Sequence, residues 1–481
     1  MHVIVPDSLA SVVPVLQEFL SCAAERLDIN REAAAETQPG FEREIRALSM
    51  AVERAIHQVD LARFDVDEPG LVMEGGRYRR AGRSNIEVLT MAGSVLVART
   101  VYRERGGSGG ASVGALELQL GLVDGRTTPA AAEMLSEFVA TNTPAVASDL
   151  ISATGTLNVS KSSLDRLAKA INRAWEPRRV QLEEAVRLRE LRTSARVDDV
   201  RLIAFSLDGV MIRMKDAPNT PGAGKDEDVP HGHQEATSAT VSLYDSTGDR
   251  LRTVGLARMP ESKKATLHAQ LLAEVEATID RHPNATLVAL SDAAVENWRI
   301  LDDICAALGI EAVRINDYFH AAEHLAAGLK AGGYKPKQIK KWCERLRDEE
   351  GAAELCLAEL ARLLSLEKTQ ASAKAKRVIE KEVTYFNNNV DRMRYAEYQR
   401  LGYPIGSGVQ EAACKTYVGH RFKQSGMSWR HQGQGVLTLR ALLLSGRLNI
   451  AWTELTPHLR RDFSVDDNTR RKMPAPQGVA A

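Results

Sequence analysis

The sequence predicts a mixed α/β core that is interrupted by an α-helical insertion and preceded by a mainly helical N-terminal region. Three observations support this fold class. Residues 197–320 alternate strand-length apolar runs with amphipathic helical stretches, residues 321–400 contain only helical periodicity, and residues 8–63 repeat apolar side chains at helical spacing. With 481 residues, 44% of them hydrophobic, the chain is long enough to bury several cores.

Composition narrows the class of protein. The formal net charge is +0 with 26% charged residues, so binding to a polyanion must come from local basic patches. The five cysteines are widely spread and form no CxxC pair, which predicts a reducing compartment without disulfides or a cysteine-bound zinc ion. No apolar run approaches the roughly 20 residues that a membrane span needs. The N-terminal sequence lacks a signal-peptide pattern, so we expect a cytoplasmic protein.

In the N-terminal part, residues 1–66 are predicted to be helical and residues 67–112 to form a small β-hairpin region. The hairpin is expected in "SNIEVLTMAGSVLVARTVYRER", where Met91-Ala92-Gly93 separates two β-rich runs. "GGSGG" at 106–110 then predicts a flexible break.

Residues 113–196 are predicted to be helical again. "TPAVASDLISATG" ends in a glycine-containing turn, and "NVSKSSLDRLAKAINRAW" resumes with Ser160 as the N-cap. Two short helices around such a turn resemble a helix-turn-helix, whose second helix would bring Lys161 and Arg166 to a DNA groove. The same pattern also fits an ordinary helical hairpin. A charged helix at 176–196 would connect this region to the core.

The order of elements in residues 197–320 favours a mixed sheet covered by helices. A buried strand, "VRLIAFSLDGVMIRM", precedes two antiparallel strands joined by an Asp-Ser-Thr-Gly turn, and helices and strands then alternate. Residues 215–233 between the first two strands are predicted to be a mobile loop. After the insertion at 321–400, residues 401–455 return to the core with long helices, and residues 456–481 are predicted to be a flexible tail.

Three carboxylates stand where core elements start or end. Asp208 ends the apolar run "LIAFSLD", Asp292 ends "TLVALSD", and Glu411 opens an Ala-rich helix. Because α/β sheets bind ligands at the carboxyl ends of their strands, these acids can converge although they lie far apart in the sequence. Clustered carboxylates repel one another unless cations neutralise them, and Mg²⁺ prefers such oxygen ligands. The set is typical of phosphoryl transfer with two divalent metal ions.

Each acid also has a purely structural interpretation. Asp208 followed by Gly209 fits a turn at a strand end. Asp292 fits an N-cap of the following helix, and Glu411 fits a first-turn acid that the helix dipole stabilises.

Basic residues follow Glu411, and the stretch from Ala412 to Thr453 contains no acid. Phosphates attract such a patch, and their neutralisation would make DNA binding depend steeply on salt. The predicted DNA-binding side chains in this stretch are Lys415, Arg421, Lys423 and Arg430, with Trp429 either packing or touching a base.

At these residues the chain resembles the DDE transposases of bacterial insertion sequences, which have an RNase H-like catalytic core, and among them the ISKra-type group related to Mutator-like transposases. The resemblance covers about residues 115–452. "FSLDGVMIR" resembles the first-acid strand, "ALSDAAVENW" the second-acid strand, and "GSGVQEAACKTYVGHRFKQSGMSW" the third-acid region. "NDYFHAAEHL", which contains Asp317 and His320, resembles the Asp-x-x-His motif of Mutator-like enzymes. A helical insertion like 321–400 also precedes the glutamate of the family.

Two features depart from the family pattern. Asp292 is followed by Ala293, where relatives often have a glycine. "RERGGSGGASVGALELQLGL" lacks the cysteine pair that many relatives carry.

The resemblance implies that Asp208, Asp292 and Glu411 are catalytic and bind two Mg²⁺ or Mn²⁺ ions in each active site, with Asp317 and His320 as accessory residues. His320 and His324 alternatively fit packed or solvated histidines, because an i, i+4 pair without a third ligand is poor evidence for zinc. The implied partners are double-stranded DNA, as the terminal inverted repeats of the element and as target, and further copies of the chain on DNA at the bacterial nucleoid. The expected activity is metal-dependent DNA cleavage and strand transfer. An inactive DNA-binding relative and an RNase H-like nuclease without strand transfer are the alternatives.

Overall fold

The computed structural model describes residues 5–28, 34–105, 112–155, 157–193, 199–215, 232–367 and 372–467. These residues belong to two compact units, one formed by Met1–Val186 with Leu448–Ala481 and the other by Arg187–Arg447. The predicted glycine-rich break at 106–110, most of the predicted loop at 215–233 and the end of the predicted tail, residues 468–481, lie outside the described residues. No helix in the described part of the chain is long and apolar enough to cross a membrane.

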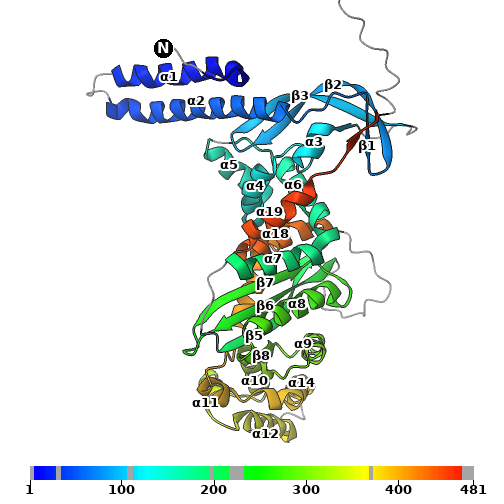
Figure 1. Ribbon diagram of the computed structural model, residues 1–481. Helices are drawn as coiled ribbons and strands as arrows, with labels where there is room; N and C mark the ends of the chain where they lie inside the picture. Colours follow the sequence, from blue (N-terminus) through cyan, green and yellow to red (C-terminus); the bar gives the residue numbers. More distant parts are fainter. Residues whose placement is uncertain are drawn as a thin grey trace, which may run out of the picture. The chain divides into compact units, whose positions relative to one another are not determined.

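The first unit begins with two helices that lie side by side, α1 (Val13–Asp28) and α2 (Ala34–Ala62) (Figure 1). They precede a five-stranded antiparallel sheet of order β10-β1-β2-β3-β4. The predicted hairpin is confirmed, because Thr90 pairs with Gly93 across the turn between the two long strands. The strands are β1 (Gly70–Met73), β2 (Gly76–Thr90), β3 (Gly93–Glu104), β4 (Val113–Gly114) and β10 (Ser464–Val465).

The strand β10 corrects the prediction of a flexible tail that starts at residue 456. Residues 456–459 form a short 3-10 helix, and Ser464 and Val465 then pair with Val72 and Leu71 of β1. Val465 also packs beside Leu71 and Tyr102 in a small apolar core. The sequence did not indicate this strand, because its two residues are held only by a partner nearly 400 positions away in the chain.

The helices of the first unit follow the prediction for residues 113–193. Ser160 caps α6 as expected, since its side chain accepts a hydrogen bond from the Ser163 backbone N–H at 3.2 Å. Leu164, Leu167 and Ile171 form the buried face of this helix. The helices are α3 (Ala115–Leu120), α4 (Pro129–Thr141), α5 (Pro144–Ala153), α6 (Lys161–Trp175) and α19 (Leu448–Leu455). The helix α7 (Arg179–Thr193) starts in the first unit and ends in the second, which begins at Arg187.

The second unit is built on a five-stranded mixed sheet of order β7-β6-β5-β8-β9, which confirms the predicted class of core. The central strand β5 is antiparallel to β6 and parallel to β8. The strands are β5 (Leu202–Arg213), β6 (His233–Tyr244), β7 (Arg250–Arg258), β8 (Thr286–Ser291) and β9 (Val313–Asn316). β6 and β7 meet at the predicted turn, where the Asp245 side chain accepts the Thr247 and Asp249 backbone N–H groups.

Alternate residues of β5 face different helices. Ile203, Phe205 and Leu207 join the apolar core that packs against α8 (Ala265–Arg281) and α9 (Val295–Leu308). Leu202 and Ala204 point to the opposite face, where the helices after β9 pack. Asp208 has the same parity as Ala204 and Ser206, so it belongs to this second face.

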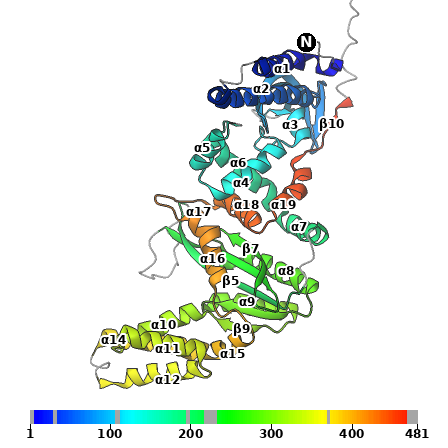
Figure 2. The same cartoon turned by 90° about the vertical axis from the view of Figure 1, so that its left-hand side faces the viewer.

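The insertion forms a layered helical bundle (Figure 2). As predicted, no strand occurs among its described residues, 321–367 and 372–400. Leu325, Leu360 and Phe386 are fully buried in one core that also contains Val288 and Ile315 of the sheet. The helices are α10 (Tyr318–Ala331), α11 (Pro336–Asp348), α12 (Ala352–Ser365), α14 (Ala373–Asn389) and α15 (Tyr395–Arg400).

The return to the core differs from the long helices that the sequence predicted. α16 (Gly408–Ala413) continues as a π-helix (Cys414–Gly419) and then as α17 (His420–Phe422) before the helix ends. The chain turns at Gly426, which has φ +75°. Trp429 then pairs in parallel with Met214, just past the end of β5: its N–H donates to Arg213 O at 2.9 Å and its carbonyl accepts from Lys215 N at 2.7 Å. Helical structure resumes only at α18 (Gln434–Leu444).

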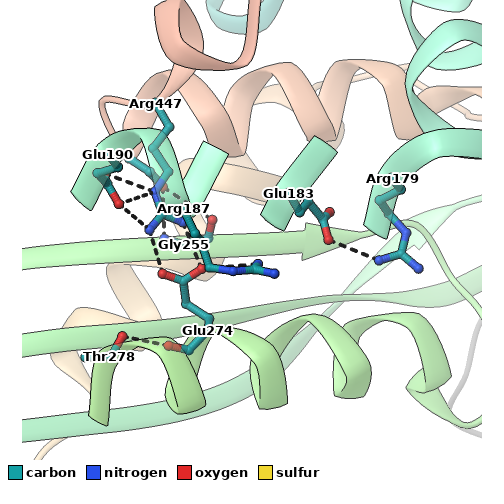
Figure 3. A network of polar contacts seen from close by, with 9 residues as sticks. Arg179, Glu183, Arg187, Glu190, Gly255, Glu274, Thr278 and Arg447 are labelled. Atoms are coloured by element: carbon teal, nitrogen blue, oxygen red, sulfur yellow. Dashed lines mark hydrogen bonds and ion pairs between the residues drawn. The ribbon is translucent and has the colours of Figure 1, made fainter. Parts of the chain in front are cut away.

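Buried charges connect the end of this segment to two other helices (Figure 3). The Arg447 guanidinium donates to both Glu190 on α7 and Glu274 on α8, with the shortest contacts at 2.7 and 2.6 Å. Burial alone would raise the pKa of Glu274, but Arg447 and the nearby Arg187 and Arg252 outweigh burial and lower it. Glu274 is therefore ionised, and both carboxylates are paired with Arg447.

Candidate active site

Asp208 lies on β5, and Asp292 directly follows the neighbouring parallel strand β8. The last recorded pair of β5 and β8 is Ser206 with Leu290, and the same offset of 84 residues relates Asp208 to Asp292. The sequence predicted that Asp208 ends its strand. This prediction is wrong, because β5 continues to Arg213 beside β6. β8 stops at Ser291, so Asp208 is beyond the part of β5 that β8 covers.

The Asp208 carboxylate is partly desolvated and has a second acid near it. Burial raises the pKa of Asp208, and the negative charge of Asp292 raises it further, whereas a hydrogen bond from the Gly209 N–H and the proximity of His320 act in the opposite direction. Gly209 N donates to Oδ1 at 2.6 Å. The Cys414 thiol donates to Oδ2 at 3.4 Å, and burial, then the Asp208 charge, raise the pKa of this thiol to about 12.

Asp292 sits in a tight turn between β8 and α9 rather than at the N-cap of the helix. The N-cap position is Ala294, and the turn places Ala293 at φ +73°, a left-handed conformation that L-residues rarely adopt. Every hydrogen bond recorded for Asp292 within the described residues goes to Oδ1. The donors are Ala294 N at 3.2 Å, Asn297 Nδ2 at 3.1 Å and Ser291 Oγ at 3.2 Å.

Glu411 is exposed in the first turn of α16, and the residue before it fixes this helix to the sheet. Gln410 is 2% exposed. Its Oε1 accepts from Ser206 Oγ at 3.1 Å and Thr240 Oγ1 at 2.9 Å, and its Nε2 donates to Ser238 O at 2.9 Å. These partners belong to β5 and β6, so Gln410 holds α16 on the sheet face that carries Asp208.

Asp317, His320 and Glu411 form a close group of three ligand-bearing side chains, whose ligand atoms all lie within 4.8 Å of one another. Asp317 is fully buried and caps α10: Oδ1 accepts from His320 N at 2.8 Å, and Oδ2 accepts from the backbone N–H of Ser407. The side chain therefore ties the end of β9 to the chain just before α16. Asp208 and Asp292 are not members of this group.

The donor atoms of both sets fit a hard divalent cation. The two strand acids and Glu411 offer carboxylate oxygens, which Mg²⁺ and Mn²⁺ prefer. Burial and the nearby charge of Asp292 disfavour the ionised form of Asp208, and a cation bound by Asp208 would offset this cost. In the second set His320 adds one nitrogen, which Mn²⁺ tolerates.

His324 is part of the fold of the insertion rather than of either carboxylate set. Its Nδ1 lies 2.5 Å from Glu382 Oε2 on α14, and its ring stacks on Tyr385 with centroids 3.7 Å apart. This agrees with the interpretation of a packed histidine.

The predicted DNA-binding residues of the C-terminal stretch fall into two classes. Lys415, Lys423 and Arg430 are exposed. Arg421 is only 1% exposed, which contradicts its predicted role as a phosphate contact on the accessible surface. Of the two roles considered for Trp429, the structure shows packing: its ring lies 4.1 Å from that of Phe422 and its Nε1 donates to Phe422 O.

Lys161 and Arg166 belong to the other unit and are both exposed on α6. Lys161 is the first residue of the helix. Arg166 donates from Nε to Asp124 Oδ2 at 3.0 Å and from Nη2 to Ser163 Oγ at 3.1 Å.

Sequence reasoning missed several polar residues that surround the acids: Glu235, Lys264, Asn297, Gln410 and Cys414. The sequence offered one indication that Gln410 belongs to the site: it directly precedes Glu411 in the third-acid motif. Lys264 stands in an unremarkable surface-like stretch, "PESKKAT", and nothing in the sequence distinguishes it from Lys263.

No protein-family model matches the chain, and no curated protein matches it. Among solved structures, the chain is similar to the Mos1 transposase paired-end complex with left transposon end, with 14% identity and a TM-score of 0.16 over 56% of this chain and 79% of that chain. It is also similar to the Mos1 mariner paired end complex with Mn, with 16% identity and a TM-score of 0.16 over 46% of this chain and 63% of that chain. A likeness at this score supports no inference, so the functional proposal rests on the residues of this chain.

Proposed function

We propose that the protein is a DNA transposase of the DDE type with an RNase H-like core, which cuts the ends of a mobile element and joins them to target DNA. The observation that carries the proposal is that Asp208 on β5 lies near Asp292, which directly follows the neighbouring strand β8, while Gln410 holds the helix that bears Glu411 on the face of β5 that carries Asp208. The strand order β7-β6-β5-β8-β9 supports the RNase H-like core.

In this proposal the acidic residues and His320 have separate roles. Asp208, Asp292 and Glu411 hold two Mg²⁺ or Mn²⁺ ions, which supply the activation of water or of a 3′-hydroxyl and the stabilisation of the leaving oxygen. Asp317 fixes the position of α16 through its bond to Ser407 N–H. His320 lies beside Glu411, where it can orient this carboxylate or a DNA phosphate.

Basic side chains on both units provide the DNA contacts in this proposal. Lys415, Lys423 and Arg430 follow Glu411 in the sequence and are exposed, so phosphates can reach them. Lys161 and Arg166 on α6 are proposed to bind the terminal inverted repeats, with α5 and α6 as the helix-turn-helix.

The test is a cleavage and joining assay with purified protein, Mn²⁺ or Mg²⁺, labelled duplexes from the ends of the element that carries the gene, and a plasmid target. We expect joined products that disappear with EDTA and fall by at least about 100-fold in Asp208→Asn and in Glu411→Gln, since each variant removes a proposed metal ligand. Glu397→Gln, at a half-buried carboxylate on α15, is the matched control.

The assay also separates the alternatives. Cleavage without joining would assign the protein as a nuclease rather than a transposase. DNA binding without either reaction would assign it as an inactive DNA-binding relative. Full activity of Asp208→Asn would refute the proposed metal ligands.

A further inference from the structure

A buried lysine, Lys264, is connected to Asp292 through one intervening side chain. Lys264 is 7% exposed, and its Nζ contacts three side chains: Asn297 Oδ1 at 2.9 Å, Glu235 Oε1 at 3.0 Å and Glu296 Oε2 at 3.4 Å. A lysine is almost never buried to this extent unless it is paired. Its neighbour Lys263 is exposed in the same turn.

The backbone around Lys264 is held in an uncommon conformation. Lys263 and Lys264 both have left-handed backbones, with φ of +54° and +50°, directly before α8. Two consecutive L-residues in this region cost free energy, so the surrounding contacts must stabilise the turn. The turn directs the Lys264 side chain toward β6 and α9, and its three recorded contacts are the compensating interactions.

Through Asn297, Lys264 acts on Asp292. An ammonium group only donates hydrogen bonds, so Asn297 must present its oxygen to Lys264 and its NH₂ group to Asp292. Asn297 is 2% exposed, and its Nδ2 donates to Asp292 Oδ1 at 3.1 Å. Lys264 therefore fixes the amide orientation that engages Oδ1, and Oδ2 has no recorded hydrogen bond within the described residues.

Lys264 also contacts Glu235, which pairs with Met211 and so lies on the opposite face of β5 from Asp208. Glu235 crosses strand β5 at Gly209, where a Cβ atom would lie 1.7 Å from Glu235 Oε1. The same Oε1 accepts the contact from Lys264. One ammonium group thus joins Asn297, the hydrogen-bond donor to Asp292, to Glu235 on β6.

We propose that Lys264 is a positioning residue of the candidate metal site, which orients Asp292 through Asn297. This inference rests on the proposed function only for the identity of the metal ligands. Hydrogen-bonding partners of metal ligands typically change metal affinity 10- to 100-fold when they are removed, and Lys264 stands one step behind such a partner.

The experiment measures Mn²⁺ binding to the DNA-free full chain by electron paramagnetic resonance, with thermal unfolding recorded for every variant. We expect Lys264→Met to weaken Mn²⁺ binding about tenfold, at the lower end of that range. Lys264→Arg keeps the charge and should retain most of the affinity. The control Lys263→Met, at the exposed neighbour with the same backbone conformation, should bind Mn²⁺ like the wild type.

A double-mutant comparison separates positioning from a general loss of structure. If Lys264 acts through Asn297, the affinity of Lys264→Met with Asn297→Ala should equal that of Asn297→Ala alone. The Mn²⁺ concentration that gives half-maximal DNA cleavage should rise in Lys264→Met with little change in the saturated rate.

Two results would overturn the inference: unchanged Mn²⁺ affinity in a folded Lys264→Met protein, or a wild-type protein that binds no Mn²⁺. The proposed function fails separately. If the wild type binds Mn²⁺ and Lys264→Met weakens binding, but no variant cuts or joins DNA, Lys264 remains a positioning residue and the transposase assignment is wrong.

Discussion

At the scale of single residues, Gln410 explains how an exposed acid can have a defined position. Glu411 itself is exposed on a short helix, and such a side chain alone has little to hold it. The neighbouring amide of Gln410 uses both its acceptor and its donor on three side chains of two strands, Ser206, Thr240 and Ser238. A buried amide that is fully satisfied holds one arrangement of its surroundings.

Gln410→Met should therefore move Glu411 as well as reduce stability. The substitution conserves volume but leaves buried polar groups of β5 and β6 without partners, which costs about 1–3 kcal/mol in the free energy of unfolding. Mn²⁺ affinity, measured on the same samples, should fall by more than the change in the folded fraction explains. The control is Gln424→Met, at an exposed glutamine of the same segment, and equal behaviour of the two variants would contradict the assigned role.

The sequence indicated that Asp208 and Asp292 lie next to buried strands. It did not indicate the residues that hold the candidate site in place, Lys264 and Gln410. Asp208 and Asp292 each follow a run of apolar residues, so their location within or directly after a buried strand is a local property of the sequence. The roles of Lys264 and Gln410 depend on partners that are distant in the chain. Gln410, for example, accepts a hydrogen bond from Ser206, 204 positions earlier. The burial of Arg421 was missed for the same reason, since periodicity in a basic segment does not reveal which cation faces the core.

At the scale of elements, Arg447 connects the end of the α18 segment to α7 and α8 (Figure 3). Glu190 and Glu274 are 4% and 3% exposed. Removal of one partner from a buried ion network leaves uncompensated charges, which is far more costly than the loss of a surface pair. The network therefore holds the last helix of the second unit against helices from the start and middle of that unit.

Arg447→Met should destabilise the second unit by about 3–5 kcal/mol. For a unit of this size, the midpoint of its thermal transition should fall by roughly 10 °C, as measured by differential scanning calorimetry. Arg394→Met removes an exposed pair, with 62% and 41% exposed side chains, and should cost less than about 1 kcal/mol. Comparable shifts in the two variants would show that the buried network does not stabilise this packing.

Elements with a strong local pattern were predicted well. The hairpin of β2 and β3, the sheet of the second unit and the helical insertion all follow from periodicity and turn residues. The π-helix at Cys414–Gly419 and the extended stretch around Trp429 were missed because the Ala-rich pattern there favours a continuous helix. Pairing of Trp429 with the end of β5 overrides that local preference.

At the scale of the whole molecule, the net charge of +0 means that DNA affinity must come from the local basic residues. Lys415, Lys423 and Arg430 are proposed to contact phosphates beside the acids. A matched set of exposed lysines occurs on α11 of the insertion, at Lys337, Lys340 and Lys341.

Replacement of Lys415, Lys423 and Arg430 by glutamine should reduce the slope of log affinity against log salt concentration by about 2–3, because each lost phosphate contact removes about 0.9 from the slope on duplex DNA. Replacement of the three α11 lysines changes the net charge equally and should leave the slope unchanged. Fluorescence anisotropy at several salt concentrations measures both. Equal slopes of log affinity against log salt concentration in the two triple variants would contradict the proposal that Lys415, Lys423 and Arg430 contact DNA.

The central claim is that Asp208 and Asp292, together with Glu411, hold the divalent ions. The most direct test is an anomalous difference map from crystals of the full chain soaked in Mn²⁺, because the structure offers two distinct sets of ligands. The account predicts a peak within about 2.2 Å of carboxylate oxygens of both Asp208 and Asp292, with Glu411 completing the site. A peak bound only by Asp317, His320 and Glu411, with none at the two strand acids, would contradict it.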